Sequence, residues 1–298
     1  MDKIKGIIVP LVTPLAAQDT IDVAGTEKLV DHVLGGGVAA LFILGTTGES
    51  QSLSVKTRRD FIELVCRTVD GRAPVLVGVT ETSMSEAIAL AQYAEACGAS
   101  GVVAAAPYYY ASSQADLISW FRTLADCSPL PVYLYNMPSH VKVFLELQTV
   151  IELSVHPNIA GLKDSSANMT YFAALLHHFA GTGFALYMGP EEQMPAAVAL
   201  GADGGVNGGA NMFPELYVEA YVAAARGDLE AVMGLQKKIM GVSGAIYNAG
   251  DGNSSYLCGL KCALEVMGIC DGYVALPYKR FDEDRKNKIS ELLKQLDV

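Results

Sequence analysis

The chain has 298 residues, of which 51% are hydrophobic and 18% charged, and its formal net charge is -11. This length and composition are typical of a globular protein with a large buried core, built as one α/β barrel or as two smaller domains. The acidic balance and the absence of a basic run argue against polyanionic partners. We therefore expect neither nucleic acid nor a membrane surface as a partner.

Cysteine usage and the first residues of the chain bear on its location. The sequence contains six cysteines without a CxxC pair, and residues 1–6 lack the apolar stretch of a signal peptide. Both features predict a reduced, cytoplasmic protein. Cys258 and Cys262 are spaced to share a helix face, but no histidine occurs in the last hundred residues to complete a zinc site. We therefore expect these cysteines to pack in the core and predict no metal.

Short apolar runs typical of buried strands recur along the chain. They lie at residues 6–10, 40–44, 75–79, 101–105, 132–135, 159–162, 185–188 and 204–206. Helical patterns lie between them: residues 57–69 and 85–97 carry apolar side chains at three- and four-residue spacing and are followed by glycines at 71 and 98. Strands and helices therefore alternate along most of the sequence.

Eight such strand–helix units in about 225 residues predict an α/β fold of the (β/α)8 TIM-barrel type. We predict a barrel domain over residues 1–225 and a C-terminal helical domain over residues 226–298. A doubly wound sheet with a separate helical domain would use the same elements. The first strand is not followed by a glycine-rich dinucleotide fingerprint, which favours the barrel.

Polar segments follow most of the predicted strands, at the positions where active sites of this fold lie. These segments are GTTGE at 45–49, PYYY at 107–110, YNMP at 135–138, KDSS at 163–166, GPEE at 189–192 and NGGAN at 207–211. Each alone has an ordinary explanation, such as a tight turn, a helix cap or a favourable charge at a helix N-terminus. Their occurrence at successive strand ends predicts one shared site.

Lys163 ends an apolar run that has the pattern of a buried strand. A lysine amine is almost fully protonated in water at neutral pH, but burial favours the neutral, nucleophilic form. Such an amine can form a Schiff base with a carbonyl compound. The alternative is a strand-end lysine whose ammonium group extends into solvent. The polar segments at neighbouring strand ends favour the Schiff-base lysine.

Five motifs, GTTGE, PYY, YNMP, GLKDSS and GADGG, occur in this order. They resemble the pyruvate-dependent class I aldolase family that contains dihydrodipicolinate synthase and N-acetylneuraminate lyase. The resemblance runs from Gly6 to the C-terminal helices. It implies an enzyme without cofactor or metal that acts on pyruvate and an aldehyde, or on the 2-keto acid that they form, and that assembles as a homotetramer, a dimer of dimers.

The resemblance also implies catalytic roles. Lys163 matches the Schiff-base lysine of the family, and Tyr135 matches the tyrosine whose hydroxyl relays protons. Thr46 and Thr47 match the pair that binds the carboxylate of the keto acid, and Thr46 also belongs to the relay. Tyr109 matches the relay residue that reaches across a subunit contact, so the chain is expected to be at least a dimer.

The second substrate depends on residues that differ between branches of the family. The synthase branch carries an arginine two residues after the proline of its YNxP motif, where this chain has His140, although Lys142 is near enough to compensate in part. The segment from Gly189 to Glu192 resembles the Gly-x-acid-Glu arrangement of sialic-acid lyases, in which Glu191 and Glu192 would bind sugar hydroxyls.

Ser165, Val206 and Asn207 are further expected substrate-binding residues, and the GLK segment at 259–261 also resembles the sugar-acid branch. We therefore predict a lyase that releases pyruvate from a sugar acid, similar to N-acetylneuraminate lyase or a 2-keto-3-deoxy sugar acid aldolase. The alternative is a 4-hydroxy-tetrahydrodipicolinate synthase, which condenses pyruvate with aspartate semialdehyde.

Two other classes of function fit a barrel. A phosphate-binding barrel enzyme would use the loops after its last two strands, and residues 201–209 are glycine-rich. Between Lys163 and Arg226, however, the sequence has no lysine or arginine to balance a dianion. A non-catalytic barrel that senses a metabolite or serves as a scaffold is the other alternative. The intact set of candidate catalytic residues argues against it, and an activity assay excludes it.

Overall fold

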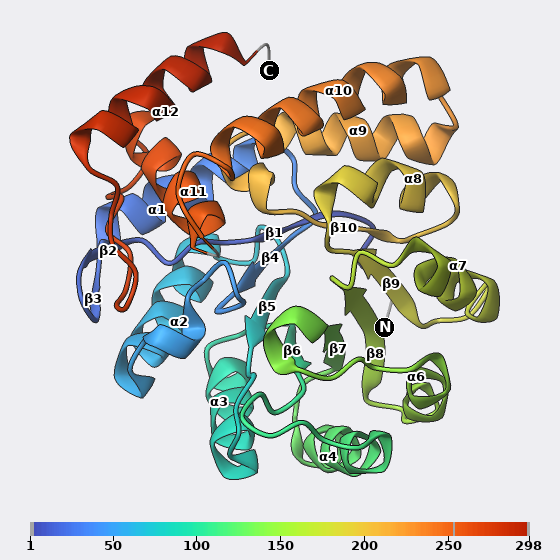
Figure 1. Ribbon diagram of the computed structural model, residues 1–298. Helices are drawn as coiled ribbons and strands as arrows, with labels where there is room; N and C mark the ends of the chain where they lie inside the picture. Colours follow the sequence, from blue (N-terminus) through green and yellow to red (C-terminus); the bar gives the residue numbers. More distant parts are fainter. Residues whose placement is uncertain (1–2, 253, 297–298) are drawn as a thin grey trace.

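A closed barrel of eight parallel strands forms the centre of the computed structural model, which describes residues 3–252 and 254–296 (Figure 1). The strands, in barrel order, are β1 (Gly6–Pro10), β4 (Ala40–Ile43), β5 (Val75–Gly78), β6 (Gly101–Ala105), β7 (Val132–Asn136), β8 (Ile159–Asp164), β9 (Ala185–Met188) and β10 (Gly204–Val206). The predicted (β/α)8 fold is confirmed.

The barrel closes where β10 pairs with β1, with Gly204 opposite Gly6. A Cβ atom on Gly204 would lie 1.9 Å from the carbonyl oxygen of Gly6. A glycine is therefore needed at this position for the two backbones to approach. The strands are buried on both faces, which explains why they are near-continuous apolar runs rather than alternating patterns.

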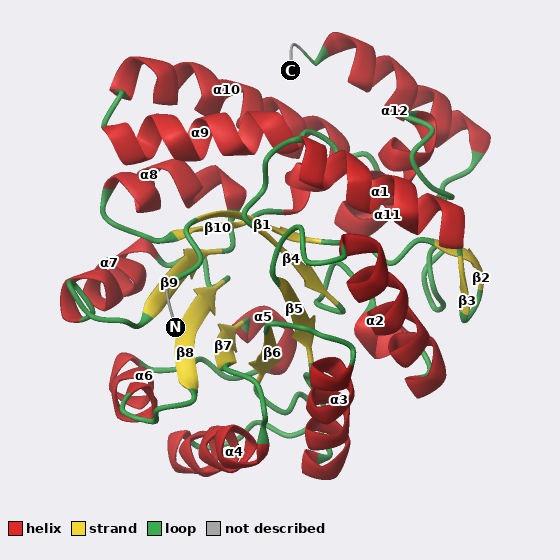
Figure 2. Cartoon of the chain, turned by 180° about the vertical axis from the view of Figure 1, so that it is seen from behind, coloured by secondary structure: helices red, strands yellow, loops and turns green. Residues whose placement is uncertain are grey.

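A layer of helices surrounds the barrel, as the view from behind shows (Figure 2). These helices are α1 (Val23–Gly35), α2 (Val55–Val69), α3 (Met84–Ala96), α4 (Gln114–Cys127), α6 (Leu147–Ser154), α7 (Met169–His178), α8 (Met194–Ala199) and α9 (Pro214–Arg226). Local signals set their ends. The α4 helix, for example, begins with a capping box in which Ser113 and Asp116 satisfy each other's backbone N–H groups.

Several short elements lie in the loops between the barrel strands and the surrounding helices. A two-stranded hairpin, β2 (Leu15–Ala17) with β3 (Thr20–Ile21), precedes α1. A short helix, α5 (Pro138–Val141), follows β7, and three 3-10 turns, η1 (Ser50–Ser52), η2 (Glu191–Gln193) and η3 (Gly208–Asn211), follow β4, β9 and β10.

The predicted C-terminal helical extension is confirmed and consists of α10 (Leu229–Ile246), α11 (Ser255–Val266) and α12 (Glu283–Gln295). The α9 and α10 helices lie side by side, and α11 reaches back toward the barrel (Figure 1). Ile239, Val242 and Leu260 of this extension belong to the same apolar core as the barrel strands. A domain boundary between residues 225 and 226 stays a prediction. Within the described residues, no helix combines the length and apolarity needed to cross a membrane.

The interior of the barrel is packed rather than open. Eight side chains, one from each strand, surround a void of about 10 Å³: Ile8, Phe42, Leu76, Val103, Tyr133, Lys163, Tyr187 and Val206. Seven of these are apolar or aromatic, and one is a lysine. The aliphatic part of the Lys163 side chain is therefore packed within the barrel core, which sets the direction of this side chain along the barrel.

Candidate active site

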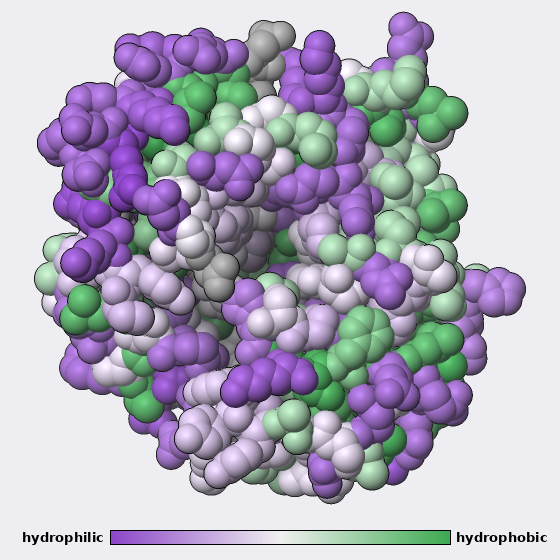
Figure 3. Space-filling view, in the orientation of Figure 1, coloured by the Kyte–Doolittle hydropathy of each residue, from purple (hydrophilic) through white to green (hydrophobic). Residues whose placement is uncertain are grey.

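A cavity of about 530 Å³ opens where the barrel strands end. Its wall includes residues 44–47 after β4, residue 105 of β6, residue 135 of β7, residue 163 of β8, residue 165 just after β8 and residues 189–192 after β9. The space-filling view shows a hollow near the middle of the face seen in Figure 1 (Figure 3). This volume is typical of a site for a small molecule.

Lys163 connects the packed barrel interior to this cavity, because its side chain borders both. The residue is 7% exposed. Its Nζ atom lies 4.2 Å from the ring centroid of Tyr135 and 5.2 Å from that of Phe42. The lysine therefore does not extend into solvent but presents its amine to the cavity between two aromatic rings.

Tyr135 and Thr46 line the same cavity as Lys163. Tyr135 on β7 is the register partner of Lys163 on β8. Its hydroxyl lies 3.3 Å from the Oγ1 atom of Thr46, with either atom able to donate the hydrogen bond. The Lys163 amine thus lies against the ring of Tyr135, and the phenol is hydrogen-bonded to the alcohol of Thr46, which is an arrangement able to transfer protons.

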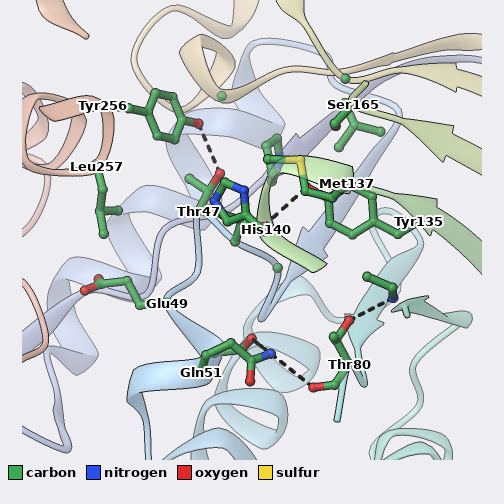
Figure 4. Close-up of a pocket in the computed structure, with 18 of the residues that line it drawn as sticks. Thr47, Glu49, Gln51, Thr80, Tyr135, Met137, His140, Ser165, Tyr256 and Leu257 are labelled. Carbon is green, nitrogen blue, oxygen red and sulfur yellow. Dashed lines mark hydrogen bonds between the residues drawn. The ribbon is translucent and has the colours of Figure 1, made fainter. Parts of the chain in front are cut away.

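Thr47 lies beside Thr46 and contacts the C-terminal helices. Its Oγ1 atom lies 3.0 Å from the hydroxyl of Tyr256 on α11, as the close-up shows (Figure 4). The ring of Tyr256 packs edge-on against Tyr247 of α10, with centroids 4.6 Å apart. Tyr247, Tyr256 and Leu257 all line the cavity. The sequence analysis missed them, since they lie outside the barrel strands whose ends it searched.

Glu191 is buried, and its carboxylate is surrounded by hydrogen-bond donors. Its Oε1 atom accepts hydrogen bonds from the hydroxyls of Tyr217 (2.5 Å) and Tyr247 (2.9 Å), and its Oε2 atom accepts one from the backbone N–H of Gly209 (2.9 Å). Burial raises the pKa of this carboxyl to about 7, against the effect of these donors. Both oxygens are therefore already engaged within the protein. Glu192 also lines the cavity.

Other predicted binding residues lie at the wall or behind it. Ser165, Gly189 and Val206 line the cavity. A Cβ atom on Gly189 would lie 2.1 Å from the Oγ atom of Ser165, so this glycine leaves room for that hydroxyl. Asn207 is fully buried, and its Nδ2 atom donates to the carbonyl oxygens of Met188 (3.4 Å) and Gly189 (3.2 Å). The structure thus places Asn207 behind the wall, where it supports Gly189.

His140 lies at the rim of the cavity on α5. Its Nδ1 atom lies 2.9 Å from the Oγ atom of Ser139. Desolvation at the rim, followed by the charge of nearby Lys163, lowers the pKa of this imidazole. His140 is therefore neutral at neutral pH and lacks the bidentate cationic fork of an arginine.

The structure places Tyr109 outside the cavity of its own chain. The side chain is 68% exposed, and its ring packs edge-on against Tyr110 with centroids 4.9 Å apart. The preceding residue, Tyr108, lines the cavity instead. Tyr108 thus faces the cavity, whereas Tyr109 and Tyr110 both face outward from the chain.

Lys261, from the GLK segment, forms a buried ion pair with Glu49. The Nζ and Oε1 atoms are 2.5 Å apart, and both side chains are fully buried. The other oxygen of Glu49 accepts a hydrogen bond from the backbone N–H of Ala275 (2.7 Å). Lys261 thus holds α11 against the loop after β4, the loop that carries Thr46 and Thr47.

Comparison with known proteins gives a consistent assignment. The model of the "Dihydrodipicolinate synthetase family" matches residues 3–296. The chain is 30% identical over 292 residues, 98% of each protein, to "4-hydroxy-tetrahydrodipicolinate synthase 2" of Halalkalibacterium halodurans. These matches cover almost the whole length of the chain.

Solved structures agree with this assignment. Dihydrodipicolinate synthase from Bacteroides thetaiotaomicron superposes with a TM-score of 0.97 at 49% identity and covers 99% of this chain and 100% of that one. The chloride-inhibited dihydrodipicolinate synthase from Acinetobacter baumannii, complexed with pyruvate, gives 0.92 at 30% identity, with 99% and 100% covered. These names favour the synthase alternative over the sugar-acid lyase that the sequence analysis put first. The chain belongs to the dihydrodipicolinate synthetase family of enzymes.

Proposed function

We propose that this enzyme forms a Schiff base between Lys163 and pyruvate and condenses the bound pyruvate with aspartate semialdehyde, as a 4-hydroxy-tetrahydrodipicolinate synthase. The observation that carries the proposal is the position of Lys163, which is buried, lines the cavity and packs its amine against the ring of Tyr135, whose hydroxyl is hydrogen-bonded to Thr46. The names of its relatives and the pyruvate bound to a 30% identical structural neighbour support the same chemistry.

The first step joins the amine to the ketone. The nitrogen of neutral Lys163 attacks the carbonyl carbon of pyruvate, and the resulting carbinolamine loses water to give the imine. The departing oxygen needs a proton, and the hydroxyl of Tyr135 is the nearest candidate donor along the strand pair. Thr46 would return that proton through its 3.3 Å contact with Tyr135.

The protonated imine then acts as an electron sink. A methyl proton of the bound pyruvate leaves, the electron pair flows toward the iminium nitrogen, and an enamine forms. The enamine carbon attacks the aldehyde carbon of the second substrate, so that one carbon–carbon bond forms. The amino group of the bound aspartate semialdehyde then attacks the imine carbon, the bond from that carbon to the Lys163 nitrogen breaks, and the ring closes as the free amine of Lys163 is released for another cycle.

The carboxylate of pyruvate needs hydrogen-bond donors two atoms away from the imine. Thr46 and Thr47 lie on the loop after β4 and line the same cavity as Lys163. Their hydroxyls, with the backbone N–H groups of the turn, are suited to bind a carboxylate without a salt bridge. These roles complete a pyruvate site at one side of the cavity.

A second candidate substrate is a sugar acid, from which the same imine chemistry in reverse would release pyruvate. The observation that favours it is the charge of the cavity wall: among its described residues, Lys163 is the one lysine or arginine, whereas Glu192 is available to accept hydrogen bonds from a polyol. His140 is neutral and therefore binds the carboxylate of aspartate semialdehyde more weakly than an arginine would.

We also propose that the enzyme is a cytoplasmic homotetramer. The six cysteines are all free, which suits a reducing compartment. The outward position of Tyr109 supports a role in the site of a neighbouring subunit.

Trapping with borohydride tests the Schiff base. Pyruvate followed by borohydride should inactivate the enzyme and leave a reduced three-carbon adduct on Lys163 alone, found by peptide mapping. Lys163→Ala should fold and take up no label, whereas Lys56→Ala, which removes an exposed lysine of α2, should be labelled as the unaltered enzyme is. Label on another lysine would disprove the mechanism.

A substrate panel then separates the two candidates. Rates of pyruvate condensation with aspartate semialdehyde are compared with rates of pyruvate release from N-acetylneuraminate and from several 2-keto-3-deoxy sugar acids. Efficient condensation with no release supports the synthase. Release from a sugar acid with no condensation would replace the proposed substrate while leaving the role of Lys163 intact.

A further inference from the structure

We infer that Tyr256, supplied by the C-terminal helix α11, is a positioning residue that orients the hydroxyl of Thr47 toward the carboxylate of pyruvate. The inference rests on the proposed function, because it assumes that Thr47 binds that carboxylate. It adds that the C-terminal helices contribute a residue to the pyruvate site.

The contact between the two residues is direct. The Tyr256 hydroxyl lies 3.0 Å from the Oγ1 atom of Thr47, across a sequence separation of 209 residues (Figure 4). Both residues line the cavity. Thr47 is 5% exposed, so its hydroxyl has few orientations open to it and depends on the neighbours that the fold provides.

The surroundings hold the Tyr256 ring in one place. A Cβ atom on Gly208 would lie 1.9 Å from the Tyr256 hydroxyl, so the glycine at this position of η3 makes room for the phenol. The ring also packs edge-on against Tyr247, whose own hydroxyl donates to Glu191 at 2.9 Å. Glu191 therefore acts through Tyr247 to support Tyr256.

The direction of the hydrogen bond follows from proton counting. The hydroxyl of Thr47 has one proton, and it can donate that proton to a carboxylate only if the partner on its other side is a donor. Tyr256 meets this requirement, since burial raises the pKa of its phenol and keeps it protonated. The chain of donors then runs from Tyr256 to Thr47 to the substrate carboxylate.

This arrangement predicts which kinetic constant depends on Tyr256. A hydroxyl that is already oriented costs less to order when the substrate binds. Loss of the Tyr256 hydroxyl should therefore weaken pyruvate binding, whereas the steps at Lys163 and Tyr135 should proceed at a similar rate. An effect on KM without a matching effect on kcat distinguishes positioning of Thr47 from general damage to the site.

Tyr256→Phe keeps the ring and removes the hydroxyl. We expect KM for pyruvate to rise roughly threefold to tenfold, with kcat changed by less than about twofold. Tyr171→Phe is the matched control, because it removes a buried phenolic hydroxyl that donates to the carbonyl oxygen of Leu145 and does not line the cavity. It should lower thermal stability and leave KM for pyruvate unchanged.

A double-mutant cycle with Thr47→Val tests whether Tyr256 acts through Thr47. If it does, adding Tyr256→Phe to Thr47→Val causes no further rise in KM. If the two effects multiply, Tyr256 acts on pyruvate independently and the inference is overturned. An unchanged KM in folded Tyr256→Phe overturns it as well.

Gly208→Ala provides a second route if Tyr256→Phe unfolds. It retains every hydroxyl but places a methyl group where the phenol oxygen lies, and it should reproduce the rise in KM. An unchanged KM in this variant would count against the inference.

Borohydride trapping at graded pyruvate concentrations distinguishes failure of the proposed function from failure of the positioning role. If the unaltered enzyme is not trapped, the proposed function fails. If it is trapped and Tyr256→Phe needs no more pyruvate for half-maximal labelling, the positioning role alone fails.

Discussion

The amine of Lys163 lies 4.2 Å from the ring centroid of Tyr135, its register partner on the neighbouring strand. The pairing of β7 with β8 thus sets the distance between the proposed nucleophile and the proposed proton donor. Both residues are held by strands rather than by loops, so their relative position does not depend on loop conformation. The remaining donors, Thr46 and Thr47, come from a loop that α11 holds in place.

Tyr135→Phe should leave the aromatic contact to Lys163 intact and remove the proton relay. We expect kcat to fall about 100-fold to 10,000-fold, the range typical of a lost general acid or base. Single-turnover labelling with pyruvate and borohydride should be slower but should still reach Lys163. Tyr133→Phe, on the same strand but facing the barrel interior, is the control and should keep kcat within about threefold. A Tyr135→Phe enzyme with full activity would contradict the relay.

His140→Arg should improve the use of aspartate semialdehyde. An arginine at the cavity rim would add a bidentate, charge-assisted grip on the substrate carboxylate, and we expect kcat/KM for this aldehyde to rise about tenfold or more. His156→Arg adds the same charge beside Asp126, outside the cavity wall, and should have little effect. Steady-state rates with saturating pyruvate provide the measurement. No gain in His140→Arg would show that another group binds that carboxylate.

Glu191 should make stability depend on pH between about 4.5 and 7. The pKa of this carboxyl rises from 4.5 to about 7 on folding, so within that window the folded state keeps a proton that the unfolded state has released. The contribution is fully present below 4.5 and is lost as pH rises toward 7, with a total of about 3 kcal/mol.

Comparison with Glu191→Gln isolates this contribution, because the other titrating groups cancel in the difference. Urea unfolding at several pH values should show the free energy of unfolding of the unaltered enzyme falling relative to Glu191→Gln as pH rises through the window. A difference that does not change with pH would show that Glu191 is ionised in the folded state throughout.

Lys261→Ala should destabilise the fold strongly. The substitution leaves Glu49 buried without its ion-pair partner, and breaking such a pair costs about 3–5 kcal/mol. Lys56→Ala removes a lysine from the exposed pair with Asp60 and should cost about 1 kcal/mol or less. Chemical denaturation of the two variants under identical conditions compares them. Equal losses of stability would mean that water reaches the Glu49 carboxylate.

Tyr109 should act in the site of a neighbouring subunit. Tyr109→Phe and Lys163→Ala are each expected to be inactive or nearly so, and subunits of the two variants, mixed and reassembled, should regain activity because one hybrid site contains both intact residues. A mixture of Lys163→Ala with Tyr135→Phe is the control and should stay inactive, since these residues belong to one chain's site. Sedimentation checks the assembly. A fully active monomer would rule out the shared site.

The sequence alone determined the barrel and the core of its site. Apolar strand runs alternate with helical periodicity, and both patterns are local, so the eight strands were predicted with ends within two residues of those observed. The position of Lys163 at the end of such a run predicted its burial, which the structure confirms. The motifs at the strand ends also predicted one shared site, because the carboxyl ends of parallel strands share one edge, and the family resemblance predicted the contact between Thr46 and Tyr135.

Only the tertiary structure decided what surrounds these residues. Tyr256 reaches Thr47 across 209 positions of sequence, and no local pattern records how α11 packs against the barrel. The two hydroxyls that engage Glu191 come from α9 and α10, so its burial could not be inferred from its place after a strand. Asn207 followed the strand-end pattern yet lies behind the cavity wall. Backbone periodicity is encoded over a few neighbouring residues, whereas these contacts depend on how whole helices pack, and only the folded chain specifies that packing.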